Sequence, residues 1–119
     1  MNKYVVFAVD GDEDKWETLS AEEKDQTYDA DNRFLALLAE RGGKVVGGQE
    51  LTHSRKTRWL TRDRAGQVLV TDGPFAETVE QISGFYIVEC DDLDDLTEAL
   101  REMLPAHSKL QIRPVLLHS

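Results

Sequence analysis

Apolar and polar positions alternate along this chain in blocks that predict strands and helices in a definite order. Apolar runs typical of strands cover residues 3–9, 44–51, 84–90 and 109–116. Two shorter alternating runs, 55–63 and 67–71, flank Arg64-Ala65-Gly66 and predict a hairpin. Gly47 and Gly48 interrupt the second strand, which indicates a bulge or the close approach of another group.

Two helices are predicted between the strands. The first begins at Ser20, which forms a capping box with Glu23, and runs to Arg41 before a Gly-Gly stop. The second begins after a cap at Asp91 or Asp92 and ends at Pro105. Their apolar stripes comprise Tyr28, Phe34, Leu35 and Leu38 in the first helix and Leu93, Leu96, Leu100 and Met103 or Leu104 in the second.

This order of elements predicts a single α+β domain over residues 1–119, with an antiparallel sheet covered on one face by two helices. The ferredoxin-like arrangement suits it best. The other face of the sheet lacks a cover, and its candidate residues are Phe7, Trp59, Phe85 and Ile87. A large exposed apolar face must meet something, so we expect a homodimer that joins sheet face to sheet face.

Asp31 interrupts the apolar stripe of the first helix, three residues after Tyr28 and four before Leu35. Its carboxylate either faces a cavity or lies where the helix has already passed beyond the core. An unpaired buried carboxylate is costly, so Asp31 needs a partner or water in either case. The polar N-terminal half of this helix, with Asp25 and Asp29, favours the position beyond the core.

The sequence predicts no metal centre and no cofactor. The acidic loop 10–14 lacks the spacing of a calcium-binding EF-hand, because Ala21 occupies the closing position. His53, His107 and His118 lack helical metal-ligand spacing, and the single Cys90 suits a core strand. No glycine-rich phosphate loop and no nucleophile motif is present.

The formal net charge is −9, from 14 basic and 23 acidic residues. This balance disfavours direct binding to nucleic acid or to an anionic membrane surface. Five basic residues nevertheless cluster at the hairpin, as an anion-binding surface or as a solvated face: Arg55, Lys56, Arg58, Arg62 and Arg64. No apolar run is long enough to span a bilayer or to act as a signal peptide, and we expect a cytoplasmic protein.

The loop between the hairpin and the third main strand reads Asp72-Gly73-Pro74-Phe75. This stretch resembles the signature of the DGPF branch of the YCII-related family. The resemblance extends in order over residues 4–13, 43–51, 71–88 and 112–115, which is most of the chain. It implies a dimeric α+β barrel in which two sheets enclose a cavity, and fold relatives that include muconolactone isomerase-like and dechlorinating enzymes.

The resemblance also implies an active site that pairs a histidine on the first helix with an aspartate, which corresponds here to Asp72. The family histidine falls near Asp31 or Asn32, and this sequence has no histidine there. Asp31 and Asp72 are therefore the candidate catalytic pair, facing each other, one of them with a raised pKa as a proton shuttle. Alternatively, Asp72 caps the amides of Gly73 and Phe75 in a turn.

The candidate ligand contacts are Gly73, Pro74 and Phe75 in this loop and the hydroxyl of Tyr86 on the next strand. Phe75 also suits the core or a dimer interface. We expect a small-molecule-binding homodimer, and its candidate activity is acid/base chemistry on a small organic substrate. The alternative is a non-catalytic regulatory or interaction module, because DGPF proteins are often encoded beside extracytoplasmic-function sigma factors.

Overall fold

The structure is a computed structural model that describes residues 1–73, 81–104 and 106–117. Pro74 and Phe75 of the predicted ligand loop lie outside these residues. In chain order the elements are β1 (Asn2–Asp10), α1 (Glu13–Thr18), α2 (Ala21–Glu40), β2 (Lys44–Glu50), the 3₁₀ helix η1 (Ser54–Lys56), β3 (Arg58–Arg62), β4 (Val68–Asp72), β5 (Gln81–Cys90), α3 (Leu93–Leu100), the 3₁₀ helix η2 (Arg101–Met103) and β6 (Lys109–Pro114).

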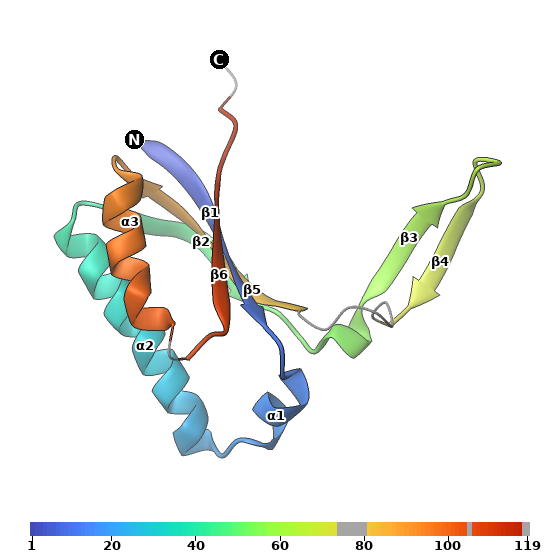
Figure 1. Cartoon of the computed structure of the whole chain (residues 1–119), viewed down its shortest axis with the longest axis horizontal. Coiled ribbons are helices and arrows are strands. Elements are labelled where there is room, and N and C mark those ends of the chain that lie inside the picture. The colour runs from blue at the N-terminus through green and yellow to red at the C-terminus, as the bar shows by residue number, and fades with distance from the viewer. Residues whose placement is uncertain (74–80, 105, 118–119) are drawn as a thin grey trace.

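Four strands form an antiparallel sheet in the order β2-β5-β1-β6. This order and the two intervening helices are the ferredoxin-like arrangement, as predicted. α2 and α3 lie on one side of the sheet (Figure 1). Because side chains alternate across a strand, β1 turns Tyr4, Val6 and Ala8 toward the helices and Val5 and Phe7 toward the open face.

The core lies between that sheet face and the two helices. Phe34 and Leu38 of α2 and Leu96 of α3 are completely buried against Val6 and Val88 of the sheet. Full burial of one such side chain contributes about 1.5–3 kcal/mol to stability. The apolar stripes of α2 and α3 therefore hold both helices against the sheet. Tyr28 and Leu35, at the margins of the predicted α2 stripe, are exposed (39% and 38%).

The capping box of α2 is confirmed. The Ser20 hydroxyl accepts the amide N–H of Glu23 at 3.1 Å, and the Ser20 amide donates to Glu23 Oε1 at 3.1 Å. At the other end the chain leaves the helix through Gly42, whose φ of 81° suits glycine. The two caps fix where α2 begins and ends, and thereby which side of the helix carries the Asp31 side chain.

The predicted bulge in β2 is also confirmed. The pairing with β5 shifts register between Val45 and Gly47, and Gly48 adopts a φ of 138°. A Cβ on Gly48 would lie 2.3 Å from the carbonyl oxygen of Phe85, so only glycine fits there. The bulge re-aims the end of β2, where Glu50 lies.

The β3–β4 hairpin forms a sheet of its own and projects away from the body of the molecule (Figure 1). All of its strand residues are exposed, including Leu60, Val68 and Val70. The prediction that Trp59 lies on the open face of the main sheet is therefore wrong. Phe7, Phe85 and Ile87 do lie together there: Phe7 pairs with Phe85, and Val5 pairs with Ile87.

Residues 13–18 form the short helix α1, which the sequence did not predict and whose first two residues belong to the predicted acidic loop 10–14. Asp12 caps it by accepting the amide N–H of Lys15 at 3.0 Å. The helix buries none of its residues, which explains why no apolar period revealed it. In the described part of the chain, no helix is long and apolar enough to cross a membrane.

Candidate functional site

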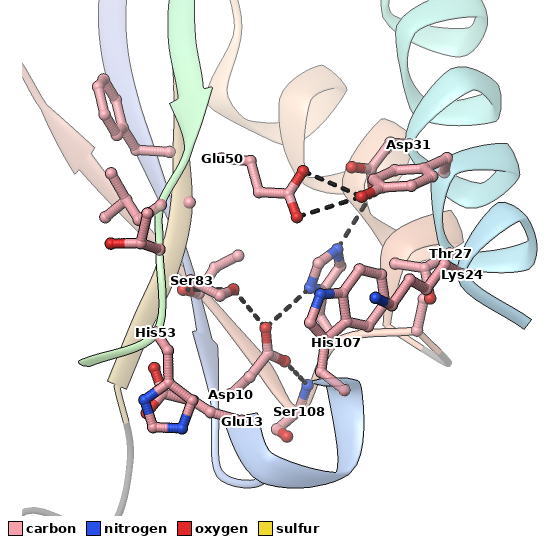
Figure 2. A pocket seen from close by; sticks show the side chains of 18 of the residues that line it. Asp10, Glu13, Lys24, Thr27, Asp31, Glu50, His53, Ser83, His107 and Ser108 are labelled. Carbon is pink, nitrogen blue, oxygen red and sulfur yellow. Dashed lines mark hydrogen bonds and ion pairs between the residues drawn. The ribbon is translucent and has the colours of Figure 1, made fainter. Parts of the chain in front are cut away.

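A cavity of about 970 Å³ lies between the sheet and the N-terminal half of α2, with α1 and η1 beside it. Its volume is within the range of pockets that hold small organic ligands. β1 and β5 supply one wall, α2 supplies another, and the segment that leads into β6 contributes His107. Figure 2 shows the polar side chains that converge inside it.

His107 lies between two carboxylates from distant parts of the chain (Figure 2). Its Nδ1 is 3.1 Å from Oδ2 of Asp10, and its Nε2 is 3.2 Å from Oδ1 of Asp31. The exposed side-chain fractions are 11% for His107, 23% for Asp10 and 20% for Asp31. Both ring nitrogens therefore have a carboxylate partner in a half-buried setting.

This arrangement shifts the pKa of the imidazole strongly. Burial alone would lower the pKa of His107, but the hydrogen bonds and charges of Asp10 and Asp31 outweigh it and raise this pKa to about 9. Burial would raise the pKa of Asp10, and hydrogen bonds from His107, Ser83 and the Ser108 amide reverse that and hold it below its usual value. At neutral pH the group is thus an imidazolium between two carboxylates.

Two phenols complete the inner wall. The Tyr86 hydroxyl donates to Oδ2 of Asp31 at 3.1 Å, and the Tyr28 hydroxyl donates to both oxygens of Glu50 at 3.2 and 3.1 Å. Burial, followed by the nearby carboxylates, raises the pKa of both phenols. Each phenol therefore remains a neutral hydrogen-bond donor.

The fold explains how these residues meet. Asp10 ends β1, and β6 pairs with β1 so that Val9 lies opposite Lys109. The residues just before β6 therefore lie beside Asp10, and the Ser108 amide donates to Asp10 Oδ1 at 3.0 Å. Asp31 lies nearly one turn before the buried Phe34, which turns it toward the same interior.

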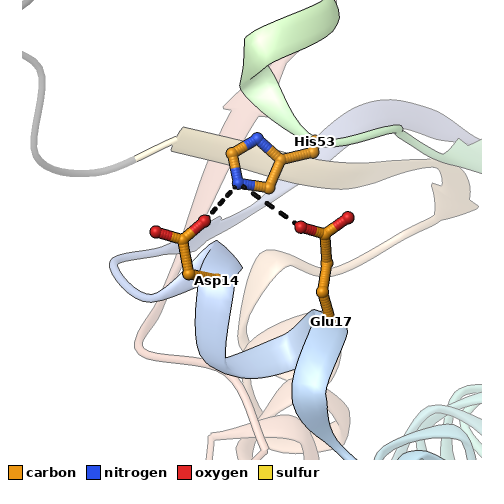
Figure 3. Close-up of side chains that lie close together, drawn as sticks. All are labelled: Asp14, Glu17 and His53. Atoms are coloured by element: carbon orange, nitrogen blue, oxygen red, sulfur yellow. Dashed lines mark hydrogen bonds and ion pairs between the residues drawn. The ribbon is translucent and has the colours of Figure 1, made fainter.

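A second cluster joins α1 to η1 near the cavity. The Ser54 hydroxyl and amide both donate to Glu13, and Arg55 binds Glu17 through two contacts of 2.6 Å. His53 Nε2 lies 2.8 Å from Asp14 Oδ1 (Figure 3). We call this group of six residues the α1–η1 clasp. It fastens a helix without buried residues to the rest of the chain.

Three members of the clasp have the residue types of a metal site: ligand atoms of Asp14, Glu17 and His53 lie within 4.8 Å of one another. Their existing contacts do not suit a metal ion. His53 Nδ1 accepts the amide N–H of Arg55 at 3.0 Å, so in the neutral imidazole Nε2 carries the proton and donates it to Asp14. Glu17 is already neutralised by Arg55. Hydrogen bonds and an ion pair account for the cluster.

The structure separates the two carboxylates that the sequence predicted to face each other. Asp31 lines the cavity, so the preference for a position beyond the core is wrong. Asp72 lies on the hairpin, 71% exposed, with its Oδ1 2.8 Å from Arg58 Nε. Asp72 ends β4 in the separate β3–β4 sheet and is not among the residues that line the cavity, whereas Asp31 is.

Of the remaining predicted ligand contacts, one lies in the cavity and another at the end of the β3–β4 hairpin. Tyr86 lines the cavity beside Asp31. The Gly73 amide donates to the Thr57 carbonyl at 2.7 Å, so Asp72 does not cap it. Sequence reasoning did not select His107, Asp10 or Glu50. The predicted topology could have indicated His107 and Asp10. In a ferredoxin-like sheet the last strand pairs with the first, which brings the residues before β6 to the end of β1.

Comparisons with known proteins agree with this fold. The profile of the YCII-related domain matches residues 3–116. An uncharacterized protein of Rhizobium meliloti (strain 1021) is 40% identical over 60 residues, and the match spans about half the length of each protein, 48% of both. The 30S ribosomal protein S6 of Thermotoga maritima superposes with a TM-score of 0.51 at 14% identity, over 96% of this chain and 87% of that one. The last likeness shows the fold alone.

Proposed function

This chain belongs to the YCII-related family, and from that premise we propose that it binds a small organic molecule in the cavity and moves a proton to or from it. The observation that carries the proposal is the Asp10–His107–Asp31 arrangement in the cavity wall. A carboxylate beside a protonated imidazole is a proton acceptor next to a fixed positive charge, which removal of a proton from a ligand needs. Asp31 keeps the role that the sequence predicted, and His107 takes the place of Asp72.

The roles follow from the remaining bonding capacity of each group. Asp10 accepts hydrogen bonds from His107, Ser83 and Ser108. Its role is therefore to orient the imidazole and stabilise its protonated form rather than to contact a ligand. Asp31 receives one donor at each oxygen and retains lone pairs directed to the cavity. In the proposed step, Asp31 takes a proton from the ligand, and the adjacent imidazolium stabilises the negative charge that develops.

Isotope exchange and native mass spectrometry together test this function. Freshly purified protein should carry a stoichiometric small-molecule adduct, whose mass identifies the ligand. That ligand should incorporate deuterium at one position in D₂O with the wild-type protein. Asp31→Asn should abolish the exchange, whereas Asp72→Asn should retain it. Exchange that is unaffected by Asp31→Asn would exclude Asp31 as the proton acceptor.

We also propose that the chain forms a homodimer through the open sheet face. Val5, Phe7, Phe85 and Ile87 form a contiguous apolar area there, because they occupy paired positions on β1 and β5. Burial of this area between two copies would remove it from water. Of these four residues, only Phe85 also lines the cavity, and Asp10, Asp31 and His107 do so from outside this apolar area, so each copy would keep its own Asp10–His107–Asp31 arrangement.

The second candidate function is a non-catalytic regulatory or interaction module, associated with sigma-factor control. The exposed hairpin favours it. Leu60, Val68 and Val70 share one face of β3–β4 and are 60–65% exposed. Removal of this hairpin should leave deuterium exchange intact if the chain is an enzyme, and should abolish partner binding if the chain is an interaction module.

A further inference from the structure

Around Asp10, Asp31 and Glu50, the recorded hydrogen-bond donors on the inner wall of the cavity point to these three carboxylates. The Tyr28 hydroxyl donates to Glu50, the Tyr86 hydroxyl donates to Asp31, and the protonated His107 ring donates to Asp10 and Asp31. The Ser83 hydroxyl and the Ser108 amide also donate to Asp10. These groups therefore leave carboxylate lone pairs for a ligand, and a ligand that contacts these carboxylates must supply the donors.

The same inner wall is negatively charged. Asp10, Asp31 and Glu50 contribute three carboxylates, and His107 and Lys24 contribute two positive charges, so these five groups sum to a net charge of −1. Among the described residues, the recorded ion pairs include none at Glu50. The negative charges of Asp31 and Glu50 both contribute to the raised pKa values of the Tyr28 and Tyr86 phenols, so the two carboxylates lie near the same phenols. A cleft whose lining has an excess of one charge attracts ligands of the opposite charge.

Aromatic rings next to these carboxylates provide a surface for a cation. Trp16 and Tyr28 meet edge to face with ring centroids 5.8 Å apart. The Lys24 ammonium lies 5.5 Å from the centroid of the Trp16 ring, and all three residues line the cavity. The protein's own ammonium thus already occupies a cation–π position in this wall.

We propose that the ligand of this cavity is a small organic cation, a protonated amine whose ammonium lies between Asp31 and Glu50 and whose apolar part lies against Trp16, Tyr28 and Tyr86. This inference rests on the proposed function, because it names the ligand class of the same site. An ammonium supplies three donors and a positive charge to a wall that offers acceptors and negative charge. A carboxylate ligand would meet like charges there.

The other cations that line the cavity do not oppose this assignment. They lie on or next to α1 and η1, where carboxylates also line the cavity. These cations are Lys15, Arg55 and Lys56, and the neighbouring carboxylates are Asp12, Glu13 and Glu17. Arg55 is already paired with Glu17.

Three probes of equal size separate the possible ligand classes. Benzylamine is a cation at pH 7, benzyl alcohol is neutral, and benzoate is an anion. Each is titrated into the full chain while amide and indole resonances are followed by NMR. Benzylamine should shift the Trp16 indole and the resonances around Glu50 in a saturable manner. The other two probes should bind at least about tenfold more weakly, since each lacks the charge-assisted contact.

Two substitutions change the local charge in opposite directions. Glu50→Gln retains an acceptor for Tyr28 and removes the charge, and it should weaken benzylamine binding about five- to tenfold. Lys24→Met retains the packing of the chain and removes the competing ammonium, and it should strengthen binding about two- to fivefold. Glu22→Gln on the outer surface of α2 is the matched control and should change the affinity by less than about twofold.

The outcomes distinguish the inference from the function on which it rests. Benzoate or benzyl alcohol bound in the cavity as tightly as benzylamine would overturn the cation inference and leave the ligand site intact. Equal weakening by Glu50→Gln and Glu22→Gln would also overturn it, because the effect would then come from net charge. If none of the three probes perturbs the cavity residues, both the inference and the proposed ligand site are rejected.

Discussion

The Nε2 atom of His107 lies 3.2 Å from Oδ1 of Asp31, although 76 residues separate the two in the chain. One comes from the segment that leads into the last strand and the other from the middle of α2. Asp10 meets the other nitrogen of the same ring at 3.1 Å. The imidazole therefore depends on two carboxylates for its charge, and several measurable properties follow from that dependence.

Stability should depend on pH through His107. Its pKa is raised to about 9 in the folded protein, above the ordinary value of about 6.5 in an unfolded chain. The resulting stabilisation is fully present below about pH 6.5 and is lost as the pH rises through about 9. Chemical denaturation should show the free energy of unfolding falling across this window, by an amount of the order of 3 kcal/mol. His107→Gln should flatten the profile there; a wild-type profile that is already flat would contradict the assignment.

The contribution of Asp31 to the pKa of His107 can be measured by itself. Asp31→Asn removes one of the two negative charges beside His107 and should lower the pKa of His107 by about 1–2. NMR titration of the imidazole proton resonances measures this value directly. Asp72→Asn is the control, because Asp72 pairs with Arg58 on the hairpin, and it should leave the titration of His107 unchanged. A similar effect of both substitutions would show that only net charge matters.

Gly48 should be intolerant of any side chain. Its φ of 138° and the 2.3 Å approach to the Phe85 carbonyl make a Cβ clash with backbone that cannot move aside. Gly48→Ala should lower the free energy of unfolding by about 2–4 kcal/mol. Gly66→Ala offers a comparison, because Gly66 also has a positive φ (86°) but faces open space; it should cost only about 1–2 kcal/mol. Equal losses for the two variants would count against the bulge geometry.

The sheet-face homodimer predicts a change in oligomeric state. Ile87 lies on the open face opposite Val5, so Ile87→Lys would place a charge in the proposed interface. Sedimentation velocity should show the wild type as a dimer and this variant as a monomer, with an unchanged far-UV spectrum. Leu104→Lys, at an exposed residue after η2, should remain dimeric. Dissociation by both substitutions, or by neither, would locate the contact elsewhere.

The local features of the fold were predictable from the sequence because their causes are local. The capping box of Ser20 and Glu23 and the glycine stop after Arg41 define α2 through contacts a few residues apart. Buried Leu96, Leu100 and Met103 follow the predicted helical stripe. With four strands and two helices in this order, the packing rules leave the ferredoxin-like arrangement as the simplest solution.

The site depended on relations that no local pattern contains. A carboxylate in an apolar stripe is compatible with a cavity wall and with a solvated helix end, and only the packing of α2 on the sheet decides that Asp31 lies in the wall. His107 gave no signal of its own, since it follows a helix end and precedes a strand. It reaches Asp10 only because β6 pairs with β1.

Asp72 shows the reverse case. The sequence singled it out through its motif, but the hairpin that carries it leaves the main sheet, and its side chain pairs with Arg58 in solvent. The sequence by itself thus determined α2, α3, the strands and their order, although not α1, because burial and capping act over short distances. Which charged groups share the cavity was decided only by strand order and register, because these bring together side chains that are as many as 97 residues apart.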